Sequence, residues 1–287
     1  MKKIAAVIVT FNNADMLANL LKDIRLQTRL PDEVIVVDNA SRDRTREMIQ
    51  RLFPEITYIR LKENQGTAGG YYEGLKAALS RNDFIWTLDD DVRINRDSLE
   101  NLVQGLEITS RTENVAVVRS VGFPNPDSAP VQMEVYTWRG CLFRSDALRM
   151  VGLPKKEFFI YGEDLEHALR LKRAGFSFFW IPSSGCVEAR DAKIVNRFLG
   201  RSFKIYPDAF RFYYAFRNEI FIYLRYGKSI NFVRTILYAL KIFIYVIIYK
   251  PAGSVRILTA IARGIFEGFS GRLGINERYL PNPNRQS

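Results

Sequence analysis

Short apolar runs alternate with amphipathic segments over the first third of the chain. The runs are typical of buried strands, and the segments repeat apolar residues at helical spacing. Strands are expected at 4–10, 33–38, 56–59 and 83–88, with helices starting near Asn13 or Asp15, near Ser41 or Asp43, and near Tyr72. Strands that alternate with helices predict a mostly parallel sheet in an α/β fold, with helices on both faces.

The pattern is less regular in the middle of the chain. Further elements are expected as strands at 115–119, 132–138 and 176–181, and as helices at 145–150 and 164–174. Gly140 to Phe143 are expected to lead into the helix at 145–150, and Pro182 is expected to close the last strand. A glycine-containing loop is expected at 64–70.

The chain becomes aromatic and basic from Phe203 onward. Residues 1–192 carry a net charge of −1, whereas residues 193–287 carry +12. This asymmetry indicates an acidic partner for the C-terminal part, either nucleic acid or an anionic membrane. Nucleic acid is disfavoured, because the basic residues interleave with long aliphatic runs instead of forming an exposed aromatic stacking surface.

Residues 230–249 are apolar and long enough to span a bilayer. Arg234 and Lys241 lie inside this run, where each would cost roughly 2.5–3.5 kcal/mol near the membrane centre. They are seven residues apart and therefore share one helical face, together with Tyr238 and Tyr245. The pattern predicts a helix in the membrane interface with its basic stripe toward the headgroups. The alternative is an amphipathic helix packed on the protein's own core or in a homodimer.

Carboxylates and amides gather at the predicted strand ends. Asp38 and Asn64 fall at or just beyond such ends, and Asp89, Asp90 and Asp91 follow the fourth strand directly. Ligands of these sheets bind at the carboxyl ends of the strands. Adjacent carboxylates repel one another unless a cation compensates, and oxygen ligands favour Mg²⁺ or Mn²⁺ bridged to a substrate phosphate. An acidic turn that caps the strand is the alternative.

Other motifs offer candidate chemistry. The Asp38-Asn39 pair could hydrogen-bond a base or ribose, and the glycines of 64–70 offer a backbone that a ligand can approach closely. Asp164 is expected near a helix N-terminus, where the macrodipole favours its ionised form. An ionised carboxylate can act as general base toward a sugar hydroxyl. Glu163 could assist this base or hold an acceptor, and a helix-capping acid cluster is the alternative.

Cysteine usage and the N-terminus add two exclusions. Cys141 and Cys186 are the only cysteines, which excludes a disulfide framework and a zinc cluster and favours a reducing compartment. The N-terminal apolar run is too short for a secretion signal and is expected to be a core strand.

These motifs together resemble the family-2 glycosyltransferases of the Rossmann-like GT-A fold. The match is closest to bacterial rhamnosyl- and galactofuranosyltransferase-like members, which build cell-surface glycans, and it covers nearly the whole chain. The motifs that carry the resemblance are Val9-Thr10-Phe11-Asn12, Val37-Asp38-Asn39-Ala40-Ser41, Asn64-Gln65-Gly66-Thr67-Ala68-Gly69-Gly70, Leu88-Asp89-Asp90-Asp91, Trp138-Arg139-Gly140, Gly162-Glu163-Asp164-Leu165-Glu166, Tyr214-Ala215-Phe216-Arg217-Asn218 and the stretch from Gly264 to Gly274.

The resemblance implies a domain organisation. Residues 1–200 would form the GT-A catalytic domain, with a nucleotide-sugar half at 1–92 and an acceptor half at 93–200. Residues 201–287 would form a helical region that associates with the membrane.

The resemblance also implies roles for the matching residues. Those implied to contact the nucleotide and the donor sugar are Thr10, Asn12, Asp38, Asn39, Asn64, Gly69, Gly70 and Asp90. Asp89 and Asp91 would hold Mn²⁺ or Mg²⁺. Asp164 would be the base of a single-displacement, inverting transfer, and Trp138 and Glu163 would line the acceptor or sugar pocket.

One position departs from the family pattern. Family members often supply a metal-ligating histidine after the strand that follows the base-bearing helix, and here Glu188 stands in its place. A carboxylate can ligate the same metals, so Glu188 is the third expected ligand. His167, the sole histidine, is interpreted as a surface or supporting residue and not as a ligand.

The implied reaction moves a sugar from a UDP- or dTDP-linked donor, such as galactofuranose or rhamnose, to a hydroxyl of a growing, lipid-linked cell-surface glycan. The enzyme would be peripheral, at the cytoplasmic face of the membrane. One rival is a metal-dependent nucleotidyltransferase that acts on a sugar phosphate and releases diphosphate. The other is a non-enzymatic membrane-binding module, which would need neither Asp89 to Asp91 nor Asp164.

Overall fold

The computed structural model describes residues 2–189, 195–198, 201–204, 208–249 and 253–281. The chain divides into two compact units. The first consists mainly of residues 1–155 and 164–190, and the second mainly of 156–163 and 191–285. The domain boundary expected at residue 200 stays a prediction. The two compact units divide instead at residue 190, and the short segment 156–163 groups with the C-terminal unit.

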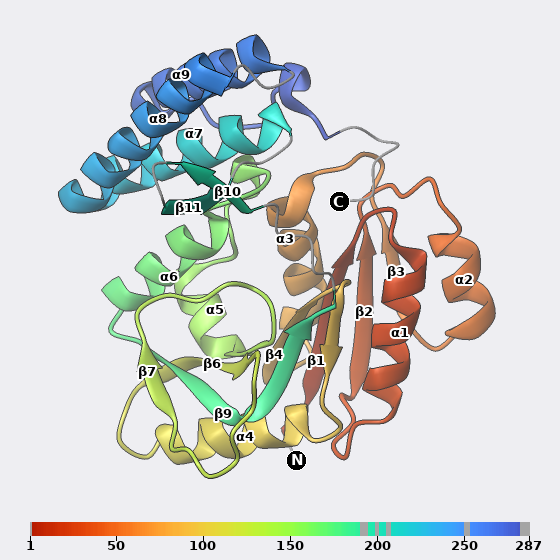
Figure 1. The fold of residues 1–287 in the computed structure, drawn as a ribbon. Helices are drawn as coiled ribbons and strands as arrows, with labels where there is room; N and C mark the ends of the chain where they lie inside the picture. Colours follow the sequence, from red (N-terminus) through yellow and green to blue (C-terminus); the bar gives the residue numbers. More distant parts are fainter. Residues whose placement is uncertain (1, 190–194, 199–200, 205–207, 250–252, 282–287) are drawn as a thin grey trace. The chain divides into compact units, whose positions relative to one another are not determined.

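A single mixed sheet forms the centre of the first unit, with strand order β3-β2-β1-β4-β8-β6-β9-β5 (Figure 1). Its parallel part contains the four predicted strands, β3 (Thr57–Arg60), β2 (Glu33–Asp38), β1 (Ile4–Thr10) and β4 (Phe84–Asp89). β8 (Cys141–Arg144) pairs antiparallel with β4, and also with β6 (Val115–Val121). This short apolar run leads into the helix α5 (Ser145–Val151), as expected, but it is also a central strand, which was not predicted.

The strand β9 (Ser177–Glu188) is longer than predicted and does not end at Pro182. Its pairing with β6 shifts register after Ile181 and resumes at Gly185, so that the proline falls in an irregularity of the ladder. The extension of β9 pairs with β5 (Val92–Ile94), and its beginning pairs with β7 (Val131–Met133). This continuation brings Glu188 opposite Val92, next to the acidic triplet.

Helices cover both faces of the sheet because the strand residues alternate between them. On β1, Ile4, Ala6 and Ile8 belong to one apolar core, and Ala5 and Val7 belong to the other. The first core receives α1 (Ala14–Arg25), α2 (Thr45–Leu52) and α4 (Ser98–Thr109). The second receives α3 (Gly66–Leu79), α5 (Ser145–Val151) and α6 (Glu163–Arg173). The predicted α/β layers are confirmed.

Glycines at the start of α3 serve packing. The predicted loop at 64–70 is shorter than expected, because α3 already begins at Gly66. A Cβ on Gly70 would lie 2.4 Å from Val9 Cγ1, and one on Gly74 would lie 2.5 Å from Val7 Cγ1. The helix can therefore rest directly on β1 only where side chains are missing.

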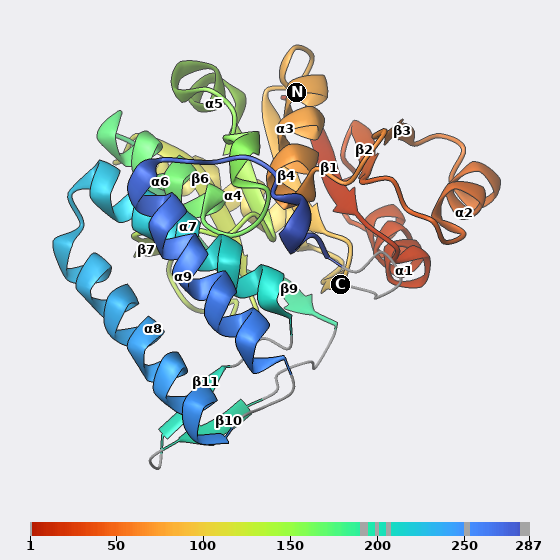
Figure 2. The same cartoon turned by 90° about the horizontal axis from the view of Figure 1, so that it is seen from above.

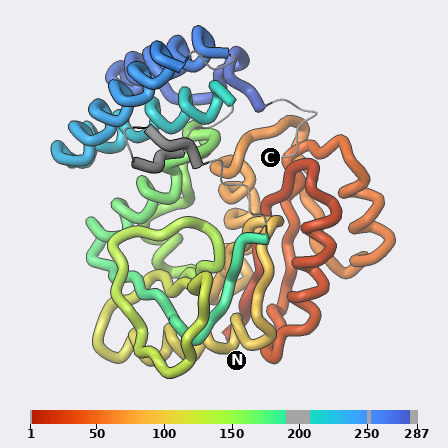
Figure 3. Tube along the Cα trace, in the orientation of Figure 1, coloured from red at the N-terminus to blue at the C-terminus, as the bar shows by residue number. Residues whose placement is uncertain are grey.

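The second unit is helical. It contains the 3-10 turn η1 (Lys156–Phe158), the hairpin strands β10 (Val195–Phe198) and β11 (Arg201–Lys204), the helices α7 (Ala209–Tyr226), α8 (Ser229–Tyr249) and α9 (Ser254–Ser270), and the 3-10 turn η2 (Glu277–Tyr279). Figures 2 and 3 show these three helices running side by side. Their shared core is aromatic, with Tyr213, Tyr214 and Phe216 of α7 buried.

The predicted apolar helix is α8, which by length and composition is apolar enough to cross a bilayer. Its buried stripe consists of Thr235, Ala239, Ile242 and Val246. Its exposed apolar residues are Ile230, Val233, Leu237, Leu240, Ile244, Ile247 and Ile248.

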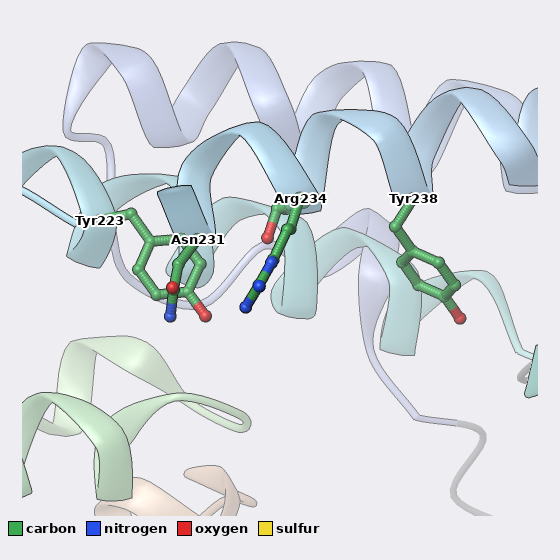
Figure 4. A pocket seen from close by; sticks show the side chains of 5 residues that line it. Tyr223, Asn231, Arg234 and Tyr238 are labelled. Carbon is green, nitrogen blue, oxygen red and sulfur yellow. The ribbon is translucent and has the colours of Figure 1, made fainter. Parts of the chain in front are cut away.

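A cavity of about 240 Å³ lies beside α8, and Arg234 and Tyr238 project from the helix on its side (Figure 4). This confirms that these two residues share one face of α8. The helix thus packs through one stripe, as the alternative interpretation expected, and leaves a second apolar face uncovered among the described residues.

Candidate active site

The parallel strands bring the predicted polar residues to one edge of the sheet (Figure 1). Thr10 is in register with Asp38 on β2, and Val9 is in register with Asp89 on β4. The carboxyl ends of β1, β2 and β4 therefore lie next to one another. Asp89 to Asp91 occupy the end of β4 and the turn that follows it.

Asp90 joins this turn to the start of the chain. Its carboxylate accepts hydrogen bonds from Thr10 Oγ1 at 2.6 Å and from Asn13 Nδ2 at 2.9 Å. Burial raises the pKa of Asp90 to about 7, although both donors favour the charged form. Asn13 was expected as a possible helix cap, but its side chain donates to Asp90 and makes no capping hydrogen bond. At the start of α1, Asp43 accepts from the backbone N–H of Ala14.

Asp89 and Asp91 are the pair expected to hold a metal. Burial raises the pKa of Asp89, against the effect of a 2.8 Å hydrogen bond from the Tyr71 hydroxyl, and the charge of Asp91 raises it further. Two carboxylates that destabilise each other's charge fit a divalent cation, which relieves the repulsion. The donor set is thus suited to Mg²⁺ or Mn²⁺.

The third expected ligand, Glu188, forms an ion pair with Arg139 at 3.0 Å. Its backbone lies beside the acidic turn, since the neighbouring Ala189 N–H donates to the carbonyl of Asp91 at 2.8 Å. Within the described part of the chain, no cluster of three His, Cys, Asp or Glu residues is arranged to hold a metal. Ligation of a metal by Glu188 stays a prediction.

The expected nucleotide residues organise the loops around the strand ends. Asp38 is fully buried, accepts from the Ser41 N–H at 2.7 Å and from the Tyr58 hydroxyl, and pairs with Arg60. Asn39 bonds the backbone of Gln65 and Gly66 and so connects two of these loops.

Asn12 and Asn64 act on the backbone in a similar way. Asn12 has a positive φ of 51° and accepts from the Arg42 N–H at 2.7 Å, while Asn64 accepts from the Gly66 N–H at 2.8 Å. Gly69 and Gly70 are buried in α3. The predicted contacts with a nucleotide or sugar stay predictions for all six residues, which are Asn12, Asp38, Asn39, Asn64, Gly69 and Gly70.

Asp164 lies in the first turn of α6, as predicted, and its carboxylate accepts from the Leu165 N–H at 2.7 Å. Burial raises its pKa to about 6, and the charge of Asp89 adds to the increase, while Arg119 opposes it. Asp164 and Asp89 therefore act on each other electrostatically within the first unit. A carboxylate with this pKa is ionised at neutral pH and is still basic enough to accept a proton.

Trp138 and His167 lie in an aromatic cluster beneath the site. Trp138 is 3% exposed and stacks on Tyr71 with ring centroids 5.0 Å apart, so it supports the hydroxyl that bonds Asp89. His167 is fully buried, bonds Tyr136 and the carbonyl of Gly152, and has a pKa lowered to about 3 by burial. It is thus a supporting residue, not a surface one.

Contact of Trp138 with a sugar stays a prediction, as does the role of Glu163, which is buried and assigned to the second unit. Three residues that act on the acids were not predicted from the sequence. The hydroxyl of Tyr71 and the charges of Arg119 and Arg139 all lower the pKa of Asp89, and Arg119 also lowers that of Asp164. Arg139 stands within the Trp138-Arg139-Gly140 motif, which was the one available signal for it. Arg119 lies on a strand and carries no signal in the sequence.

Comparisons with known proteins agree with this geometry. The profile of Glycosyl transferase family 2 matches residues 5–155. The chain is 30% identical over 203 residues to galactofuranosyltransferase GlfT1 of Mycolicibacterium smegmatis, covering 61% of this chain and 67% of that protein. It is 32% identical over 108 residues to the GalNAc(5)-diNAcBac-PP-undecaprenol β-1,3-glucosyltransferase of Campylobacter jejuni, covering 36% of this chain and 34% of that protein.

Among solved structures, the mannosyltransferase PcManGT of Pyrobaculum calidifontis, in complex with GDP-Man and Mn²⁺, superimposes with a TM-score of 0.60. The two are 16% identical, and the match covers 94% of this chain and 88% of that one. This likeness supports the predicted GT-A fold. With the family profile matched over more than half its length, the chain belongs to glycosyl transferase family 2.

Proposed function

We propose that the protein is an inverting, divalent-metal-dependent glycosyltransferase that elongates a lipid-linked cell-surface glycan. The observation that carries the proposal is that the site has two kinds of carboxylate. Asp89 and Asp91 lie together at the end of β4 and in the turn after it, and Asp164 lies separately on α6. The two sites suit different tasks, because one is a repelling pair that fits a cation and the other is a single group with a pKa of about 6. Transfer of a sugar from a nucleoside diphosphate needs both.

Each group has one task in the proposed reaction. Asp164 accepts the proton of the acceptor hydroxyl while that oxygen attacks the anomeric carbon from the face opposite the leaving nucleotide, which inverts the configuration. Asp89 and Asp91 hold the cation, which when bound neutralises charge on the diphosphate. Asp90 holds the acidic turn in place through Thr10 and Asn13.

The donor is proposed to be UDP-galactofuranose or dTDP-rhamnose. The named activity of GlfT1 supports a galactofuranosyl donor, and the polyprenyl-diphosphate glycan in the name of the Campylobacter enzyme supports a lipid-linked acceptor. A buried edge of Asp38, Asn39 and Thr10 at the strand ends is where a nucleoside would bind in this type of sheet.

A donor screen tests the proposal. Purified protein is incubated with UDP-galactofuranose, UDP-galactose, dTDP-rhamnose or GDP-mannose, together with extracted membrane lipids and Mn²⁺, and transfer of labelled sugar to lipid is measured. Transfer with release of nucleoside diphosphate, abolished by EDTA, is expected for one donor. Release of diphosphate from a nucleoside triphosphate and a sugar phosphate would instead identify a nucleotidyltransferase.

We also propose that α8 holds the enzyme on the cytoplasmic face of an anionic membrane. The uncovered apolar face of α8, with Leu237 and Ile244 at its centre, supports this location. Arg234 and Lys241 flank that face and can contact lipid headgroups while the aliphatic residues enter the acyl boundary. The second unit would then present the enzyme to a lipid-linked acceptor.

A further inference from the structure

The segment 156–163 interrupts the first unit and ends one peptide bond before Asp164. Three of its residues have positive φ values, since Phe159, Tyr161 and Gly162 have φ values of 66°, 66° and 83°. The left-handed region costs roughly 1–3 kcal/mol for a residue with a side chain. Two such residues so close together persist only where their surroundings hold them.

Asn218 of α7 holds this segment through its side-chain amide. Its Nδ2 lies 3.0 Å from the carbonyl of Phe158, 2.9 Å from that of Ile160 and 2.7 Å from that of Tyr161. The residue is fully buried. One amide group thus donates to carbonyls on both sides of the left-handed residues, and an apolar side chain would remove this donor from all three carbonyls.

Arg217 completes the arrangement. Its guanidinium donates to the carbonyls of Phe158 at 3.0 Å and Glu157 at 3.2 Å, and its Nε donates to Asn218 Oδ1 at 2.8 Å, which orients the amide. The guanidinium lies over the ring of Tyr214 at 4.7 Å and is 1% exposed. These hydrogen bonds from a buried cation fix Asn218 and the carbonyls of residues 157 and 158 relative to one another.

The remaining contacts hold the side chains of the segment. Phe159 packs on Tyr214 with centroids 4.7 Å apart, and Arg211 donates to the Tyr161 hydroxyl at 2.6 Å. A Cβ on Gly162 would lie 3.0 Å from Cδ1 of Ile222 on α7, so the glycine lets the turn approach this helix closely.

From this geometry we infer that Arg217 and Asn218 are positioning residues for the base, because they hold the strained turn from which the chain enters α6 at Glu163 and Asp164. The inference rests on the proposed role of Asp164. Neither residue touches the reacting atoms, and both act through the direction and rigidity of the chain that presents the carboxylate. A misplacement of about 1 Å at a catalytic group can reduce a rate about a hundredfold.

The test compares Asn218→Ala with Ile220→Ala. Ile220 is a buried residue of the same helix, and it lies close to Gly268 of α9. Ile220→Ala thus truncates a buried side chain of α7 but keeps the amide of Asn218, so it controls for the loss of core packing alone. Transfer from UDP-galactofuranose to a polyprenyl-diphosphate oligosaccharide is measured with UDP affinity and melting temperature. Asn218→Ala is expected to lower kcat about a hundredfold with UDP affinity unchanged, while Ile220→Ala loses stability and keeps kcat.

A double variant separates positioning from general support. Because Arg217 and Asn218 act through Asp164, adding Asn218→Ala to Asp164→Asn should cost little further activity, whereas independent effects would multiply. Equal kcat values for Asn218→Ala and Ile220→Ala would overturn the positioning inference. Asp164 would still be the proposed base if Asp164→Asn were inactive in the same assay. Full activity of Asp164→Asn would instead reject the base.

If Asn218→Ala does not fold, Arg217→Lys decides the question. Lysine keeps the charge but cannot reach two carbonyls and Asn218 in fixed directions. A fall in kcat with unchanged UDP affinity supports the inference, and a kcat equal to that of Ile220→Ala overturns it.

Discussion

At the scale of single residues, the four acids of the site differ because their surroundings differ. Asp90 is buried and accepts from two side-chain donors, Asp89 accepts from the Tyr71 hydroxyl, and Asp164 lies in the first turn of a helix. The same functional group therefore gives a structural tie, a proposed metal ligand and a proposed base. Burial raises the pKa values of Asp89, Asp90 and Asp164, as this placement explains.

Replacing the proposed base tests that assignment most directly. Asp164→Asn keeps the shape of the side chain but cannot accept the proton, so kcat should fall by about 10²–10⁴-fold. UDP affinity and melting temperature should stay close to those of the wild type. Glu166→Gln, which changes the carboxylate that pairs with Lys155 and Arg170 in the same helix, is a control for altered charge in α6.

The pH dependence has a defined sign. Asp164 has a pKa of about 6, so lowering the pH through 6 protonates the base and should reduce kcat/KM about tenfold per pH unit, while the rate levels off above it. Initial rates measured over about three pH units around this pKa give the acid limb. Its survival in Asp164→Asn would assign the limb to another group.

The metal proposal concerns Asp91. Asp91→Asn removes one charged ligand, and a loss of about 1.4 kcal/mol in binding would raise the Mn²⁺ concentration for half-maximal rate tenfold. Titration of Mn²⁺ into EDTA-treated protein measures this change. Glu188→Gln serves as the comparison, because an equal effect would make Glu188 a ligand and no effect would leave it as the partner of Arg139.

A site residue could be predicted from the sequence only where the local sequence pattern marked it. The strand-end acids and Asp164 were identifiable because each follows an apolar run or begins a helix. Arg119 and Tyr71 were not, because their action on the acids depends on how β6 and α3 pack in the folded chain, which no local pattern shows. The partners of Asn13 and Glu188 were missed for the same reason.

At the scale of elements, the sheet shows where sequence patterns suffice. The strands β1, β2 and β4 are largely buried and give continuous apolar runs, so their existence was predicted closely. β8 was missed because four residues ahead of a helix give no period, and β9 was cut short because proline normally ends a strand. In the structure a shift of register absorbs Pro182.

Close packing of α3 on β1 leads to a stability prediction. In Gly70→Ala the new methyl would meet Val9 Cγ1 at 2.4 Å, so strand and helix must separate, at a cost of about 1–3 kcal/mol in the free energy of unfolding. Urea unfolding measures it. Gly122→Ala, where a Cβ would meet nothing within 4 Å, should change the free energy by less than about 0.5 kcal/mol.

At the scale of the whole molecule, charge and apolar surface divide between the two units. The net charge of residues 193–287 is +12, and the exposed face of α8 is aliphatic. The sequence predicted the basic and tyrosine face of α8. It could not reveal that another stripe of the helix is buried by α7 and α9, because that packing is tertiary.

Vesicle binding tests the proposed location. Leu237→Glu and Ile244→Glu place a charge on the uncovered face of α8, and each should weaken binding to phosphatidylglycerol vesicles about tenfold or more, since burial of such a side chain is worth about 1.5–3 kcal/mol. Co-sedimentation measures this. Phe123→Glu changes a residue of the first unit that is 91% exposed and should have no effect. Unchanged binding of both α8 variants would leave that face without a membrane role.

The path of the chain through the two units has a consequence for synthesis and dissection. The segment 156–163 leaves the ribosome well before Arg217 and Asn218, so its left-handed turn cannot be held until α7 has been made. A protein truncated after residue 190 would keep every acid of the site and lose every described side chain of α7 that binds this turn. A single cut after residue 190 therefore separates the acids of the site from the α7 side chains that hold this turn.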